Sequence, residues 1–172
     1  AANSIWQHQR AKKGGEMLLQ LTEAQKLLEG GKADEAATQF GVIAADARGE
    51  FKDLALVWKS RALLAANKKL EAIEALKNAV ADGSSLWTDV ACLRLAGLDA
   101  KAAETCLNAK ANSPLAATRA EWSAANLWAK GDHAGAIAAI EKIMADKNTD
   151  TESRERLQQW LNSMKQQQES KK

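Results

Sequence analysis

The chain has 172 residues, which fits one domain or one short helical array, and 46% of them are hydrophobic. Its 24 basic and 22 acidic side chains nearly cancel to a formal charge of +2, which argues against the strongly basic face that nucleic acids require. Helix-favouring Ala, Leu, Lys, Glu and Gln dominate, with one proline and no tyrosine, so we expect an all-α protein.

The first fourteen residues, 1–14, include Arg10, Lys12 and Lys13, and we expect them to form a polar stub ahead of the folded domain. The first residue is alanine rather than methionine, so we expect an upstream signal or membrane anchor to be missing from this sequence. No stretch of the chain itself approaches the ~20 apolar residues that a membrane span needs.

A pattern then recurs four times over residues 15–148: a turn residue is followed five positions later by alanine. The four pairs are Gly31 and Ala36, Asn67 and Ala72, Gly97 and Ala102, and Gly131 and Ala136. The turn residues lie 36, 30 and 34 positions apart, a period typical of helical repeats. A leucine stands four positions before each turn residue and an apolar residue nine after it, namely Leu27, Leu63, Leu93 and Leu127, then Phe40, Leu76, Cys106 and Ile140.

These spacings predict four helix–turn–helix hairpins, because glycine or asparagine often ends a helix and alanine lets a second helix approach closely. The helix pairs span 15–29 and 33–47, 51–66 and 69–82, 86–96 and 99–110, and 115–130 and 134–146. One hairpin cannot bury its apolar face alone, so we expect the hairpins to stack as a short right-handed solenoid. An ordinary helical bundle with accidental near-periodicity is the alternative.

Local residues agree with these boundaries. Asp82-Gly83 is typical of a helix end, and Ser113-Pro114 of a helix start. Asp150 or Thr151 can cap a last helix over about 152–168. Its apolar face carries Leu157, Trp160, Leu161 and Met164. We therefore expect residues 149–172 to form a capping helix and a polar tail.

The four segments resemble tetratricopeptide repeats in their glycine–alanine spacing, in Phe40 and in Pro114, although the tyrosines of that family are absent. Three stretches carry a narrower resemblance, namely 4–10 (Ser-Ile-Trp-Gln-His-Gln-Arg), 29–40 around the first turn, and 90–99 (Val-Ala-Cys-Leu-Arg-Leu-Ala-Gly-Leu-Asp). They are similar to the soluble domain of the ancillary subunit family of the bacterial Sec translocon, which shares its repeat domain with the cell-division coordinator proteins of the envelope.

The resemblance implies a protein at the periplasmic face of the inner membrane, held by one N-terminal helix that this sequence lacks. Its partners would be the Sec translocon, envelope chaperones or their clients. A cytoplasmic adaptor is the alternative, and an apolar segment of ~20 residues just before Ala1 would separate the two.

We expect no enzyme, cofactor or metal site. The two histidines, His8 and His133, have no second ligand at metal-binding spacing. The sequence has no glycine-rich phosphate loop and no nucleophile motif. The two cysteines, Cys92 and Cys106, fall on the two helices of one predicted hairpin, so both a disulfide and a pair of buried thiols stay open.

In stacked hairpins the first helix of each pair lines a concave groove, at positions three, six and ten before the turn residue. The groove would hold the side chains Leu28, Val57, Arg61, Leu64, Trp87, Arg94 and Trp128. We expect it to bind an extended or helical peptide, whose acidic groups the arginines would hold.

Two alternatives stay open. Trp87 and Trp128 could pack between repeats or against the last helix, and we expect Trp58, Trp122 and Trp160 to be structural. The groove could also be filled by a chain terminus or by a second copy, which would make the protein a self-assembling helical domain or a homodimer.

Overall fold

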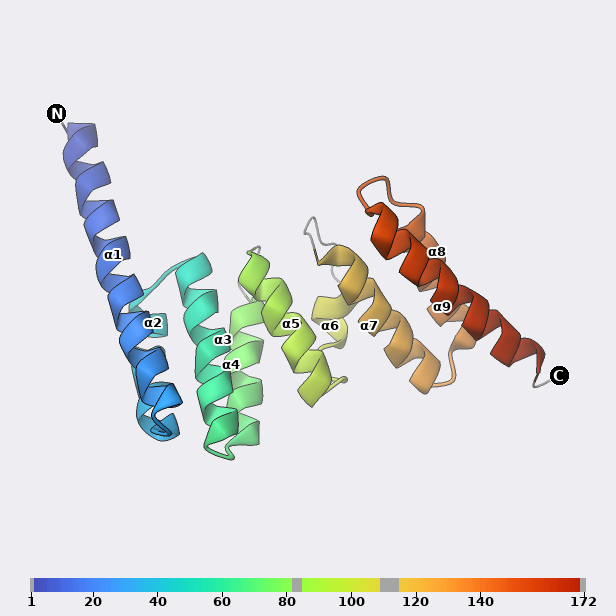
Figure 1. The fold of residues 1–172 in the computed structure, drawn as a ribbon, viewed down its shortest axis with the longest axis horizontal. Helices are drawn as coiled ribbons and strands as arrows, with labels where there is room; N and C mark the ends of the chain where they lie inside the picture. Colours follow the sequence, from blue (N-terminus) through green and yellow to red (C-terminus); the bar gives the residue numbers. More distant parts are fainter. Residues whose placement is uncertain (1, 82–84, 109–114, 171–172) are drawn as a thin grey trace. The chain divides into compact units, whose positions relative to one another are not determined.

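The computed structural model describes residues 2–81, 85–108 and 115–170, with side chains from residue 12 onward. Within these ranges every regular element is a helix and no strand is found (Figure 1). In chain order the helices are α1 (Ala2–Glu29), α2 (Ala33–Asp46), α3 (Glu50–Ala65), α4 (Lys69–Ala81), α5 (Leu86–Leu98), α6 (Glu104–Asn108), α7 (Ala116–Ala129), α8 (His133–Met144) and α9 (Thr151–Glu169). The predicted all-α class is therefore confirmed. Among the described helices, none has the length and apolarity to cross a membrane.

The chain divides into two compact units, residues 1–91 and 92–172, and the division falls within α5. In the first unit α1 packs on α2, α2 on α3, and α3 on α4. Its largest fully buried side chains are Phe40, Leu76 and Val57, which come from α2, α4 and α3. Figure 1 shows the first half of the 28-residue α1 running beyond the 14-residue α2.

In the second unit α6 contacts α7, α7 packs on α8, and α8 packs on α9. One apolar cluster joins the last three helices, and its buried members are Ala124, Ala136, Ile140, Leu157, Leu161 and Met164. Half of these residues come from α9. This helix therefore covers the apolar face of the α7–α8 hairpin, as expected for a last helix that is apolar on one side and polar on the other.

Three of the four predicted turns share one backbone geometry. Gly31, Asn67 and Gly131 have φ values of 78°, 60° and 85°, in the left-handed region. The amide after each turn residue donates to the carbonyl oxygen of the leucine four positions before it: Lys32 to Leu27 at 2.9 Å, Lys68 to Leu63 at 2.8 Å, and Asp132 to Leu127 at 3.0 Å. This bond satisfies a carbonyl group that the end of a helix leaves without a partner.

The repeat positions beside these three turns are buried as the spacing predicts. The alanines five positions after the turns, and the large apolar residues nine positions after them, have no exposed surface: Ala36, Ala72 and Ala136, then Phe40, Leu76 and Ile140. The small residues seven positions before the turns are buried as well, namely Ala24, Ser60 and Ala124. The small side chains of these hairpins are therefore enclosed, as close packing of two helices requires.

The hairpin formed by α5 and α6 departs from the prediction. Gly97 does not have positive φ and lies inside α5, and α6 begins at Glu104 instead of near residue 99. Residues 109–110 of the predicted helix lie outside the described residues. The chain turns at Asp99, whose carboxylate accepts a hydrogen bond from the amide of Ala102 at 2.9 Å. The prediction for Gly97 was wrong because a glycine inside a helix costs only about 1 kcal/mol, whereas Asp99 supplies its own turn.

The two chain ends also test the sequence predictions. The helix expected from residue 15 begins at Ala2, so residues of the predicted stub continue α1. Gly14 and Gly15 do not interrupt it, because good helix formers surround them. The cap expected for the last helix is confirmed, since the carboxylate of Asp150 accepts from the amide of Ser153 at 2.8 Å. The predictions at Asp82-Gly83 and Ser113-Pro114 lie outside the described residues.

Candidate functional site

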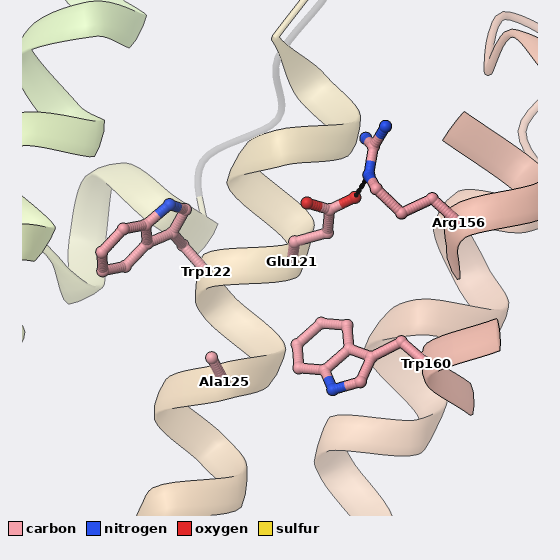
Figure 2. A pocket seen from close by; sticks show the side chains of 5 residues that line it. All are labelled: Glu121, Trp122, Ala125, Arg156 and Trp160. Carbon is pink, nitrogen blue, oxygen red and sulfur yellow. Dashed lines mark hydrogen bonds and ion pairs between the residues drawn. The ribbon is translucent and has the colours of Figure 1, made fainter. Parts of the chain in front are cut away.

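A pocket of about 340 Å³ lies between α7 and α9 in the second unit (Figure 2). Its lining is mostly apolar and comes from five residues: Glu121, Trp122 and Ala125 of α7, and Arg156 and Trp160 of α9. Figure 2 shows Trp160 pointing from α9 toward α7. Pockets that bind other molecules are typically of this kind, concave and apolar with a few polar groups at defined positions.

Helical spacing brings these side chains together. Glu121 and Ala125 are four residues apart on α7, and Arg156 and Trp160 are four residues apart on α9, so each pair shares one face of its helix. Ala125 has only a methyl group, which leaves space that the indole of Trp160 does not fill. The pocket therefore depends on a small residue on one helix facing a large one on the other.

One ion pair bridges the two walls. Nε of Arg156 donates to the carboxylate of Glu121 at 2.8 Å, and both ends of the pair reach solvent (Figure 2). A second nitrogen of the same guanidinium donates to the hydroxyl of Ser153 at 3.4 Å. An exposed ion pair adds little stability, but these bonds fix the orientation of both polar groups beside an apolar surface.

Trp122 and Trp160, which we predicted to be structural, line this pocket. Trp122 is 39% exposed, among the larger exposed fractions of the described apolar side chains. A structural role for Trp122 therefore stays a prediction. Trp160 is half-buried and also packs against the core cluster, so it combines a structural role with pocket lining. The sequence did carry one indication, since Trp122 and Ala125 are three residues apart on one helix.

The predicted groove residues of the first unit differ in their exposure. Val57 is 2% exposed, so it belongs to the core and its inclusion in the groove was wrong. Arg61 and Leu64 are exposed on α3, one helical turn apart, and Leu28 and Trp87 are half-buried. In the first two hairpins the position ten before the turn, Leu21 and Val57, is covered by neighbouring side chains and belongs to the core.

The two groove residues predicted in the second unit also differ. Arg94 is exposed on α5. Trp128 packs against the core cluster and lies over His133, with ring centroids 4.1 Å apart. This contact favours the core role of Trp128 that the sequence left open. The seven predicted residues come from both units, so a continuous groove stays a prediction.

Cys92 of α5 and Cys106 of α6 form a disulfide, with Cα atoms 5.9 Å apart. This resolves the choice that the sequence left open. Cys92 is buried and Cys106 is partly exposed. The guanidinium of Arg119, buried in α7, donates to the carbonyl oxygen of Cys106. The disulfide and this hydrogen bond thus connect the short α6 to the helices before and after it.

The described residues contain no group of three or more His, Cys, Asp or Glu side chains placed to hold a metal ion. His133, at the start of α8, lies against Trp128 with its ring tilted by 44°. No family model, curated protein or solved structure matches the chain.

Proposed function

We propose that this chain is a protein-binding module that holds partner peptides on its helical surfaces rather than catalysing a reaction. The pocket between α7 and α9 carries the proposal. Trp122, which is 39% exposed, and the half-buried Trp160 both line it, and tryptophan is among the residue types most enriched where single side chains dominate binding energy. The fixed Glu121–Arg156 pair at the same place supplies the polar contacts that orient a bound chain.

The finer part of the proposal concerns the architecture. We infer that the hairpins are tetratricopeptide-like and form a short right-handed solenoid. Three turns with left-handed residues, each followed by a buried alanine, support this. The short α6 is the main departure from such a repeat.

The proposed place of action is the periplasmic face of the bacterial inner membrane. The Cys92–Cys106 disulfide supports an oxidising compartment, because disulfides persist there and are rare in the cytosol. Association with the Sec translocon or with envelope chaperones is the most specific part of the proposal, and it rests on the resemblance of three sequence stretches alone.

The proposal is tested by co-purification of the chain with envelope proteins, followed by affinity measurement with each purified partner. We expect Trp122→Ala to weaken the binding of a true partner by more than about 1 kcal/mol. Leu70→Ala is the matched control, because Leu70 is an exposed apolar residue on α4 and does not line the pocket. Partners that bind both variants as tightly as the original chain would exclude the pocket as the binding site.

Self-association is a second candidate, favoured by apolar side chains on the outer surface of the first hairpin. Leu18 and Leu19 of α1 and Val42 of α2 are all more than half exposed. An apolar face of a helical hairpin is normally covered by a neighbouring hairpin or by a second molecule. Light scattering of the purified chain decides this candidate: a dimer that dissociates on Leu19→Lys supports it, and a concentration-independent monomer excludes it.

A further inference from the structure

An aromatic stack in the first unit presents one arginine to solvent. Phe40 of α2, which is fully buried, stacks on Trp58 of α3 with ring centroids 5.9 Å apart and planes 20° from parallel. The guanidinium carbon of Arg61 lies 4.9 Å from the centre of the Trp58 ring. A guanidinium above an indole gains cation–π attraction and loses much of its rotational freedom.

Arg61 is exposed, and no carboxylate among the described residues pairs with it. Several other surface cations are neutralised by neighbouring carboxylates, namely Lys32, Lys68, Lys77, Lys130, Arg156 and Lys165. What distinguishes Arg61 from an unpaired lysine is the stack, which fixes its planar donor groups before any partner arrives. A guanidinium fixed in this way is suited to donate two hydrogen bonds to the two oxygens of one carboxylate.

An apolar side chain accompanies this cation. Leu64 follows Arg61 by three residues on α3 and is 37% exposed. Side chains at this spacing lie about 5–6 Å apart on one face of a helix. A ligand that contacts both must therefore carry a negative group and an apolar group at a similar separation.

We propose that Arg61 and Leu64 form a docking site for an acidic segment of a partner protein, with a carboxylate held by Arg61 and an apolar side chain packed on Leu64. A helix with a glutamate and a leucine three or four positions apart has this spacing. Charge complementarity selects this partner over nucleic acid, because the chain as a whole carries a formal charge of only +2.

This inference rests on the proposed binding role but uses a surface on α3, so it can be tested separately. The probe is a short fluorescein-labelled helical peptide with one glutamate preceding a leucine by four positions. Its affinity for the full chain is measured by fluorescence anisotropy. We expect Arg61→Ala to weaken binding about tenfold or more, and Arg61→Lys to recover only part of the loss, because lysine keeps the charge without the planar donor fork.

Two matched controls make the result specific. Arg48→Ala removes the same charge from an exposed arginine of the same unit, and we expect it to change affinity less than about twofold. A probe with glutamine in place of glutamate is expected to bind the original chain as weakly as the glutamate probe binds Arg61→Ala. Circular dichroism checks that each variant is folded.

Failure of the probe to bind, equal losses in Arg48→Ala and Arg61→Ala, or equal affinity for the two probes would each overturn the proposal. Trp122→Ala separates this result from the proposed function. We expect it to leave the affinity for the probe unchanged, because Trp122 belongs to α7. If only the Trp122 variant loses its partners, the α7–α9 pocket acts in binding and the Arg61 site does not.

Discussion

The α3–α4 hairpin is held together by apolar packing, whereas the α5–α6 hairpin is held by a covalent bond. The 13-residue α4 buries Ala72, Leu76 and Ala79. The described part of α6 has five residues, and the Cys92–Cys106 disulfide ties it to α5. Cys106 stands at the same repeat position as Leu76 of α4, nine residues after the turn residue of the sequence pattern. A disulfide can thus replace the packing that a longer second helix would provide.

The largest expected effect comes from removing that covalent bond. The cysteines are 14 residues apart in sequence, and a disulfide closing a loop of about that length is worth ~3 kcal/mol. We therefore expect Cys92→Ser with Cys106→Ser to lower the free energy of unfolding by about that amount, as measured by urea denaturation followed by circular dichroism. Hydrogen exchange should show that protection is lost first in α6. A change below about 0.5 kcal/mol would mean that packing alone holds α6.

The second effect sharpens the contrast between the two hairpins at the shared alanine position. Ala72 is fully buried, whereas Ala102 is half-buried in the turn before α6. Leucine at position 72 overpacks the hairpin, and we expect Ala72→Leu to cost about 1–3 kcal/mol of unfolding free energy. Ala102→Leu should lower the unfolding free energy by less than about 1 kcal/mol, because the side chains around this half-buried turn can move to accommodate leucine. Equal losses in thermal unfolding would show that both alanines are close-packed.

The sequence predicted most of the architecture because three hairpins follow one physical rule. In those hairpins a left-handed residue ends the first helix, and an alanine five positions later permits close packing. The rule failed at Gly97, where the sequence spacing was right but Asp99 offered a competing turn. The repeat spacing alone does not show which of two nearby turn residues forms the turn.

The third effect tests this failure directly with two glycines. Gly131 has φ of 85°, so Gly131→Ala places a side chain in an unfavourable conformation and should cost about 1 kcal/mol or more. Gly97 is inside α5, and a Cβ there would meet only the end of Trp122 at 3.9 Å, an ordinary contact. We therefore expect Gly97→Ala to stabilise the chain by about 0.5–1 kcal/mol. Urea titrations of both variants measure the change in unfolding free energy. A loss for Gly131→Ala with a gain for Gly97→Ala supports the structure, whereas a loss for both would indicate that Gly97 is a turn residue.

The candidate site was less predictable than the fold. Helical spacing places Arg61 and Leu64 on an exposed face, but it does not show that Val57 is covered by neighbouring helices. The pocket depends on Trp160 of α9 facing Ala125 of α7, which are 35 residues apart in sequence. Such a pairing follows from how α9 packs on the α7–α8 hairpin. No local pattern encodes it.

The smallest expected effect concerns α9, whose first turn is stabilised by a capping hydrogen bond in place of apolar packing or a disulfide. The amide of Ser153 donates to the carboxylate of Asp150, and this hydrogen bond is the main cause that lowers the pKa of Asp150 below its ordinary value of 3.8. A carboxylate with a lowered pKa stabilises the folded state above pH 3.8, and this stabilisation disappears as pH falls through the lower folded-state pKa. The chain should therefore be more stable than Asp150→Ala at neutral pH, and the difference should shrink in acid.

Asp150→Asn is the matched control, because asparagine also caps helices but does not titrate. Urea unfolding of the three proteins between pH 7 and about pH 2 measures the differences. We expect the advantage of the original chain over Asp150→Asn to vanish in acid, while Asp150→Asn keeps its own advantage over Asp150→Ala. If the advantage of the original chain over Asp150→Asn is independent of pH, the charge of Asp150 does not contribute and only the geometry of the cap holds the start of α9.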